Sequence, residues 1–284
     1  MNPRVSIIYL TKNGGANFRQ SLESVFHQNV NFPFEVIAID SGSIDSTLEI
    51  SADYDVRVEH IAPDAFNFGL TRDYGFSLAR GRILVTLSQD AVPANSDWLQ
   101  NLCKPFQDPT IAAVQGREIP WSEREIFFWD KIGVFHLVRV SKRWAKLHQG
   151  LGLSFVNCAV RRSVWEKNRL GRVEMSEDKV FQKMLAEQKH RIVYAREARV
   201  WHSHNYDLKS LVKRCKNEGL GWENANMGYS RIDMLLDMFH PAILLILVYG
   251  LLTFQIRSPS EFLFPWIRPF YLYKGNHYTG SYII

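Results

Sequence analysis

The strongest constraint on the fold is a stretch of ten residues, Gly81 to Asp90, which reads GRILVTLSQD. A glycine opens it, a run of aliphatic and β-branched residues follows, and a polar Gln-Asp pair ends it. A short apolar run between helix-like segments is typical of a buried strand in a parallel sheet. Ligands bind at the carboxyl ends of such strands, so Asp90 is placed to hold a metal ion or a sugar. A second interpretation is that Asp90 caps the helix around Trp98, since Asp is a favoured capping residue.

Strand-like and helix-like segments alternate through the first part of the chain. The strand-like runs are residues 5–11, 34–39, 56–61 and 81–90, and the helix-like segments are residues 16–28, the segment opened by 41–47, and 70–79. Strands that alternate with helices predict βαβ units. The expected fold class is therefore α/β, with an open, mostly parallel sheet flanked by helices.

The middle of the chain continues with expected helices at 98–106, 125–148 and 176–188, and expected strands at 111–115, 155–160 and 191–201. In the segment 125–148, aromatic residues such as Phe128, Phe135 and Trp144 alternate with lysines and arginines. One interpretation is a helix that packs into the core and exposes a basic face. The other is a surface that meets a lipid headgroup or a phosphorylated acceptor.

The C-terminal part differs from the rest in composition. Residues 241–254 form an apolar run without a charge, which is short compared with the roughly 20 residues of a membrane-spanning helix. Such a run fits an interfacial or re-entrant segment, or a helix buried against the enzyme. The aromatic and basic residues that follow are a mixture common at membrane–water boundaries. We therefore expect an enzymatic domain at 1–230 and a helical, membrane-peripheral segment at 231–284.

Charge and cysteine content restrict the partners and the compartment. The formal net charge of +5 favours anionic partners such as nucleotides, phosphates or membrane lipids. No nucleic-acid recognition motif is present, so nucleic acid is not an expected partner. The chain enters its first strand almost at once, so no signal peptide is expected. Three widely spaced cysteines fit a reduced, cytosolic protein without structural zinc.

Polar residues follow several of the expected strands where each strand ends. They are Thr11 with Asn13, Asp40 with Ser41, Asp90, and His202 with His204. Each has a simpler explanation alone, because Asp is a common turn former and a single His is more often a satisfied surface or core residue. At one edge of one sheet, together they predict a site for a nucleotide and a metal ion. A carboxylate with an imidazole suits Mn²⁺ or Mg²⁺, which would neutralise a diphosphate leaving group as a Lewis acid.

The order and spacing of several motifs resemble family 2 glycosyltransferases with the GT-A fold, particularly the bacterial rhamnosyltransferases. The resemblance covers roughly residues 3–230. The matching segments are VSII at 5–8 with TKN at 11–13, DSGSIDST at 40–47, FNFGLTR at 66–72, LSQDA at 87–91, Glu177-Asp178, and His202-Ser203-His204.

The resemblance implies roles for individual residues. It places the nucleotide-sugar donor against Thr11, Asn13, Asp40, Ser41, Arg72 and Gln89. It makes Asp90 a metal ligand, with His202 or His204 as a further ligand, and Asp178 the general base. Glu177 would orient the loop or bind acceptor hydroxyls. The family's metal motif is commonly Asp-x-Asp, whereas Ser88 stands at its first position here, which puts the strictness of metal dependence in doubt.

The function expected from this resemblance is inverting, metal-assisted transfer of L-rhamnose from deoxythymidine-diphosphate rhamnose (dTDP-rhamnose). The expected acceptor is a glycan or a lipid-linked glycan in bacterial surface polysaccharide synthesis. The basic segment and the apolar tail place the enzyme in the cytoplasm, peripheral at the inner face of the plasma membrane. Two alternatives stay open: a UDP-hexose donor, and a non-catalytic module that binds glycan or membrane partners.

Overall fold

The computed structural model describes residues 3–121, 126–134 and 137–280. The chain divides into two compact units. Unit 1 comprises Met1–Ile119, Leu151–Val173 and Asp178–His202, and unit 2 comprises Pro120–Gly150, Glu174–Glu177 and Ser203–Ile284. Unit 2 therefore joins the C-terminal helices to segments from the middle of the chain. The functional division at residue 230 stays a prediction.

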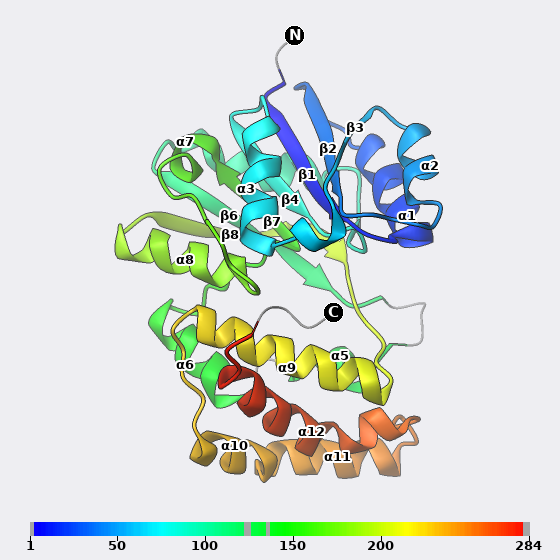
Figure 1. Ribbon diagram of the computed structural model, residues 1–284, viewed down its shortest axis with the longest axis vertical. Helices are drawn as coiled ribbons and strands as arrows, with labels where there is room; N and C mark the ends of the chain where they lie inside the picture. Colours follow the sequence, from blue (N-terminus) through cyan, green and yellow to red (C-terminus); the bar gives the residue numbers. More distant parts are fainter. Residues whose placement is uncertain (1–2, 122–125, 135–136, 281–284) are drawn as a thin grey trace. The chain divides into compact units, whose positions relative to one another are not determined.

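Unit 1 is built on an eight-stranded sheet with the order β3-β2-β1-β4-β7-β6-β8-β5 (Figure 1). The strands are β1 (Val5–Thr11), β2 (Phe34–Asp40), β3 (Val56–His60), β4 (Ile83–Leu87), β5 (Val92–Pro93), β6 (Ile111–Ile119), β7 (Asn157–Arg161) and β8 (Arg191–Trp201). The predicted α/β class and its strands are confirmed, although β6 extends four residues beyond the expected 111–115.

Helices cover both faces of this sheet, which gives a three-layer arrangement. The helices of unit 1 include α1 (Gly15–Phe26), α2 (Thr47–Ala52), α3 (Phe68–Leu78), α4 (Trp98–Cys103), α7 (Arg162–Trp165) and α8 (Glu177–Glu187). One buried cluster joins α1, α2 and α4 to the sheet through residues such as Phe18, Ile50 and Trp98. A second cluster joins α3, α7 and α8 through Phe76, Trp165 and Phe181.

The central strand β4 differs from the expected pattern on one side. It pairs parallel with β1 but antiparallel with β7, so the parallel environment holds only toward β1. All five residues of β4 are buried, which explains its continuous apolar run. The interpretation of Asp90 as a helix cap is wrong, because Asp97 is the N-cap residue of α4.

Unit 2 is helical in the part of the chain that the structure describes. Its helices are α5 (Phe128–Ile132), α6 (Arg139–Leu147), α9 (Leu208–Asn224), α10 (Arg231–Met238), α11 (Pro241–Leu252) and α12 (Pro259–Asn276). Helix α12 packs along α9, where glycines permit close approach: a Cβ atom at Gly219 would overlap the carbonyl oxygen of Leu272. The buried Arg268 of α12 pairs with Glu218 of α9 at 2.8 Å.

The segment expected as one helix at 125–148 is two helices. Gly133 ends α5 with a left-handed φ of 73°, and α6 begins at Arg139. Phe128, Trp129 and Trp144 are buried, which confirms the core-packed interpretation for these residues. Glu125 and Phe135 lie outside the described residues.

The aromatic tail also contributes to the core of unit 2. Phe264 and Leu272 of α12 are buried, and Trp129 stacks on Phe264 with ring centroids 4.9 Å apart. Glu261 accepts a hydrogen bond from the backbone N–H of Phe128 at 2.8 Å. Helix α12 therefore contributes to the core of unit 2, and the membrane-peripheral role expected for residues 231–284 stays a prediction.

The close α9–α12 contact predicts that a glycine-to-alanine substitution in α12 lowers the stability of the protein, the opposite of its usual effect in a helix. Replacing Gly by Ala in a helix interior normally stabilises by about 0.5–1 kcal/mol. At Gly275, the added methyl group would overlap the backbone of Lys216. We expect Gly275→Ala to destabilise by about 1–3 kcal/mol through overpacking, measured as a lower midpoint of thermal unfolding. Gly228→Ala, where nothing lies within 4 Å of the added atom, is the control, and an equal midpoint in both variants would contradict the packing described.

Candidate active site

The ends of β1 and β2 bring the first predicted donor-binding residues together. The two strands are parallel, and Thr11 is opposite Asp40 in the register. The Thr11 hydroxyl donates to Asp40 Oδ1 at 3.3 Å, and the Ser41 hydroxyl donates to the carbonyl of Thr11 at 3.1 Å. All three side chains are buried. The predicted grouping of these three residues at one sheet edge is present in unit 1.

Asp40 also organises the loop that follows it. Its Oδ2 accepts hydrogen bonds from the backbone N–H groups of Gly42 and Ser43, both at 3.0 Å. Its Oδ1 accepts from the Ser43 hydroxyl at 2.5 Å. These contacts hold the loop in one conformation and leave the carboxylate occupied by the protein's own donors. A donor contact by Asp40 stays a prediction.

Asn13 and Gln89 hold neighbouring loops to one another. Asn13, at a left-handed φ of 52°, accepts a hydrogen bond from the backbone N–H of Ile44 at 2.9 Å. The Gln89 amide bonds both backbone groups of Lys12, accepting at 3.0 Å and donating at 3.1 Å. The loops after β1, β2 and β4 are thus cross-linked by side-chain hydrogen bonds, which is the rigidity that a nucleotide-binding edge needs.

Asp90 and His202 meet because β5 pairs with the end of β8. Val92 is opposite Trp201 in this antiparallel pair. Asp90, two residues before β5, therefore lies near His202, the residue that follows β8. His202 Nε2 is 3.6 Å from Asp90 Oδ1. His202 Nδ1 is 3.2 Å from Glu118 Oε2. The side chain of His202 is only 12% exposed, so this imidazole is held between two carboxylates.

The separation of the Asp90 and His202 atoms fits a shared divalent cation. Two ligand atoms bound at about 2.1 Å to one octahedral ion lie roughly 3–4.2 Å apart, and the observed distance is 3.6 Å. Carboxylate oxygen and imidazole nitrogen are both ligands of Mn²⁺-type ions. His204 belongs to unit 2, where its backbone N–H donates to Asp130 Oδ2 at 3.1 Å. Only one residue, Ser203, separates it from His202, so their Cα atoms lie within about 7 Å.

Sequence reasoning missed Glu118. It lies in the part of β6 beyond the expected strand end, and β6 pairs parallel with β8. The available signal was a carboxylate that follows an apolar strand, the same signal that identified Asp40 and Asp90. The expected strand ended at residue 115, so Glu118 was not recognised as a residue near the end of a strand.

Arg72 on α3 and Asp178 at the start of α8 both act electrostatically on Cys158 of β7. Burial raises the pKa of the Cys158 thiol, the negative charge of Asp178 raises it further, and Arg72 opposes the rise. The Arg72 guanidinium also lies over the ring of Phe155, 5.2 Å from its centroid. Arg72 is buried, which is unusual for a charge without a functional or structural role.

Glu177 and Asp178 begin α8 but have different surroundings. Asp178 belongs to unit 1, and its side chain is 17% exposed. Its Oδ1 accepts a hydrogen bond from the backbone N–H of Lys179 at 2.7 Å. Glu177 belongs to unit 2 and is buried. The predicted division of roles between the two acids is compatible with this difference and stays a prediction.

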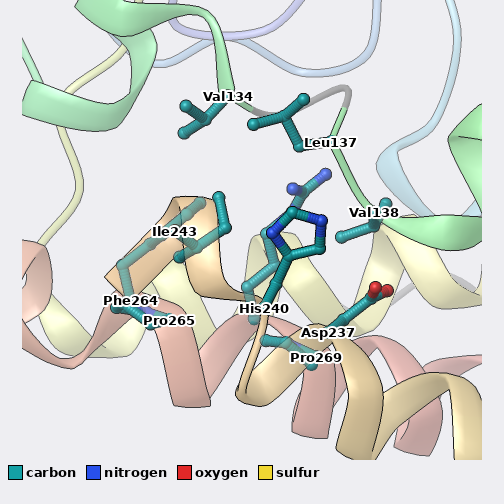
Figure 2. A pocket seen from close by; sticks show the side chains of 10 residues that line it. Val134, Leu137, Val138, Asp237, His240, Ile243, Phe264, Pro265 and Pro269 are labelled. Carbon is teal, nitrogen blue, oxygen red and sulfur yellow. The ribbon is translucent and has the colours of Figure 1, made fainter. Parts of the chain in front are cut away.

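The cavities described in unit 2 contain none of the predicted donor-binding, metal-binding or catalytic residues. One has a volume of about 20 Å³ and is lined by apolar residues with Asp237, His240 and Arg268 (Figure 2). This is space for a single water molecule, so it is not a ligand site. Another, of about 370 Å³, has polar lining residues that include Glu174, Glu223 and Asn224.

Sequence comparison identifies relatives of this chain. The glycosyl transferase family 2 profile matches residues 6–169. The O-antigen chain rhamnosyltransferase RfbN of Salmonella typhimurium is 30% identical over 230 residues, which cover 76% of this chain and 72% of RfbN. WbaN of Salmonella anatum, also an O-antigen chain rhamnosyltransferase, is 30% identical over 77% of this chain and 72% of its own length.

Solved structures share the fold. Mannosyltransferase PcManGT from Pyrobaculum calidifontis, in complex with GDP-Man and Mn²⁺, gives a TM-score of 0.63 at 16% identity, covering 97% of this chain and 86% of that one. Glucosyl-3-phosphoglycerate synthase from Mycobacterium tuberculosis, with Mn²⁺, UDP-Glc and phosphoglyceric acid, gives 0.58 at 17% identity, covering 80% and 81%.

The fold, the polar sheet edge and these relatives define a glycosyltransferase with a GT-A fold. The chain belongs to glycosyl transferase family 2, which confirms the resemblance seen in its motifs.

Proposed function

We propose that this glycosyltransferase transfers L-rhamnose from dTDP-rhamnose, with inversion, to a hydroxyl of a glycan or lipid-linked glycan in bacterial surface polysaccharide synthesis. The observation that carries the proposal is the relationship to RfbN and WbaN. Each is 30% identical to this chain, and the match spans 72% of each relative's length. Both are named as O-antigen chain rhamnosyltransferases.

Asp178 is the proposed general base. Its carboxylate takes the proton from the acceptor hydroxyl, and the oxygen attacks the anomeric carbon from the face opposite the diphosphate. The donor is held at the edge formed by Thr11, Asn13, Asp40, Ser41, Arg72 and Gln89. Among these residues, Arg72 supplies the positive charge suited to the diphosphate.

We assign a divalent cation, Mn²⁺ or Mg²⁺, to Asp90 and His202, and His204 stays the alternative imidazole ligand. When bound, the ion supplies Lewis-acid stabilisation of the diphosphate leaving group. The ligand-like spacing of Asp90 and His202 and the Mn²⁺ bound in PcManGT support this assignment.

Two alternatives make different predictions for the same assay. A UDP-hexose enzyme turns over UDP-glucose in preference to dTDP-rhamnose, as the UDP-Glc complex of the mycobacterial synthase illustrates for that protein. A binding module releases nucleotide diphosphate from neither donor. Transfer measured with both donors, in the presence of Mn²⁺, distinguishes the three cases.

The metal assignment predicts a severe defect in Asp90→Ala. Loss of the only carboxylate in the LSQDA motif should lower transfer by at least about 10²-fold, the scale of losing one electrostatic stabiliser of the transition state, and excess EDTA should do the same to the wild type. Turnover rates check both. Asp97→Ala is the control, because Asp97 is an exposed carboxylate of the same segment that makes no side-chain capping hydrogen bond. Normal turnover in Asp90→Ala, or full activity in EDTA, would refute the metal role.

The base assignment predicts different effects at two adjacent acids. Asp178→Asn keeps the shape and removes the basicity, so kcat should fall by about 10²–10⁴-fold. The donor's KM should change little, because Asp178 acts on the acceptor. Glu177→Gln, which is also isosteric, is the matched control and should retain most of its kcat. An inactive Glu177→Gln beside an active Asp178→Asn would reverse the assignment.

The apolar helices of unit 2 support attachment to the cytosolic membrane face. The stretch Arg231–Leu252 is long and apolar enough to cross a membrane by length and composition, yet 22% of its window is buried in the protein. Ile243 and Leu247 of α11 pack into the core, whereas Leu245, Val248 and Leu252 are exposed. A helix with one packed side and one apolar exposed side fits a position in the plane of the interface.

Substitutions on the exposed side test this attachment without removing the core helix α12. We expect Leu245→Glu with Leu252→Glu to lower the fraction that sediments with anionic lipid vesicles by at least about tenfold, because each leucine loses about 1.5–3 kcal/mol of burial. Ile44→Glu, at an exposed apolar position in unit 1, is the control. Unchanged sedimentation of the double variant would show that this surface does not meet the lipid.

A further inference from the structure

His202 is positioned by the strands on either side of it. Its backbone N–H donates to the carbonyl of Ile119 at 2.9 Å, and Ile119 is opposite Trp201 in the β6–β8 pair. Glu118, one residue earlier on β6, therefore lies beside the imidazole, and its Oε2 is 3.2 Å from Nδ1. The opposite ring nitrogen, Nε2, is the one that faces Asp90.

This alignment depends on an irregularity in the sheet. Gly116 is opposite Ala195, but the next residue, Arg117, is opposite Arg199, so three residues of β8 are left unmatched. Without this bulge, Ile119 would be opposite Ala198 instead of Trp201, and Glu118 would not lie beside His202.

A buried amide holds the bulge in place. The Asn157 side chain donates to the carbonyls of Ala198 and Arg117, at 2.9 and 3.3 Å. Its Oδ1 accepts from the indole N–H of Trp98 at 2.9 Å. Asn157 is fully buried, so these bonds cross-link the bulged strand to the core and fix the approach of Glu118 to His202.

We infer that Glu118 is a positioning residue for the metal ligand His202, an inference that rests on the proposed metal-assisted function. Its carboxylate accepts a hydrogen bond from Nδ1–H, and this bond selects the tautomer whose Nε2 lone pair faces Asp90 and the cation. The negative charge also makes that nitrogen a stronger ligand. Glu118 contacts Nδ1, whereas Asp90 faces Nε2 on the other side of the ring, so Glu118 acts through the imidazole.

The test is the affinity of the full-length protein for Mn²⁺, measured by electron paramagnetic resonance of the free ion in the presence of saturating dTDP. Glu118→Gln keeps the size of the side chain and removes its charge. We expect it to weaken Mn²⁺ binding by about 10–100-fold. Glu197→Gln removes one negative charge from an exposed position of β8 and should leave the affinity within about twofold of the wild type, given the screening of exposed charges.

A double-mutant cycle separates positioning from a simple charge effect. If Glu118 acts through the imidazole, Glu118→Gln should change the affinity less than about twofold when introduced into His202→Ala. A similar loss in both backgrounds would show that Glu118 attracts the ion directly and would overturn the inference. So would an unchanged affinity in Glu118→Gln alone.

Two further measurements keep the outcome decisive. If the wild type and Asp90→Ala bind Mn²⁺ equally, the proposed metal site itself fails, whereas loss in Asp90→Ala with no loss in Glu118→Gln refutes only the role of Glu118.

If Glu118→Gln lacks the native near-ultraviolet circular dichroism, Glu118→Asp replaces it. The shorter side chain cannot keep the contact, so Mn²⁺ affinity equal to the wild type would again overturn the inference.

Discussion

The pairing of β5 with β8 brings together the two residues of unit 1 to which we assign a metal ion. β5 has only two residues, yet its register sets Val92 opposite Trp201. Asp90 lies two residues before Val92, and His202 follows Trp201, so this register brings Asp90 and His202 together. Their separation in the sequence is more than a hundred residues, so the loop entropy of this contact is compensated by the rest of the sheet. The proposed metal site is thus a product of sheet topology and not of a local motif.

The predicted donor-binding residues at the carboxyl ends of β1, β2 and β4 are also brought together by contacts between distant segments. Here the contacts are side-chain hydrogen bonds and not a strand pair. Asp40, Asn13 and Gln89 use their side chains to bond the backbone of neighbouring loops. These bonds satisfy groups that no strand reaches at the sheet edge, where unpaired buried polar groups are costly. The loops are therefore ordered without a ligand, so binding of the proposed nucleotide-sugar donor would cost less ordering free energy.

Much of the fold could be predicted because its central strands β1, β2 and β4 are buried on both faces. The run ILVTL at 83–87 and the similar runs at β1 and β2 have no polar side to confuse the assignment. Pairing direction could not be predicted, because an antiparallel neighbour such as β7 leaves no mark on the sequence of β4. The packing of α12 could not be predicted for a related reason. Aromatic residues suit both an interface and a core, and the contact of Gly275 with Lys216 that selects the core is visible only in three dimensions.

The candidate site follows the same division. Thr11, Asp40 and Asp90 were found because each directly follows or ends an apolar strand, which is a local signal. Glu118 was missed because its function requires the bulge between Gly116 and Arg117. A shift in strand register depends on Asn157, a residue of a different strand, and no periodicity in β6 or β8 reports it.

Ser88 gives the Glu118–His202 contact its electrostatic meaning. The common Asp-x-Asp motif of the family supplies two carboxylates from one loop, whereas here Ser88 leaves Asp90 alone. A neutral imidazole donates an electron pair to a cation but brings no charge. Glu118 Oε2 is 3.2 Å from Nδ1 of that imidazole. It supplies a second negative charge behind the ring, outside direct contact with the proposed cation. In the proposed site, a cation would contact one carboxylate directly and would feel the second only through the imidazole, so it would keep more positive charge to stabilise a diphosphate leaving group.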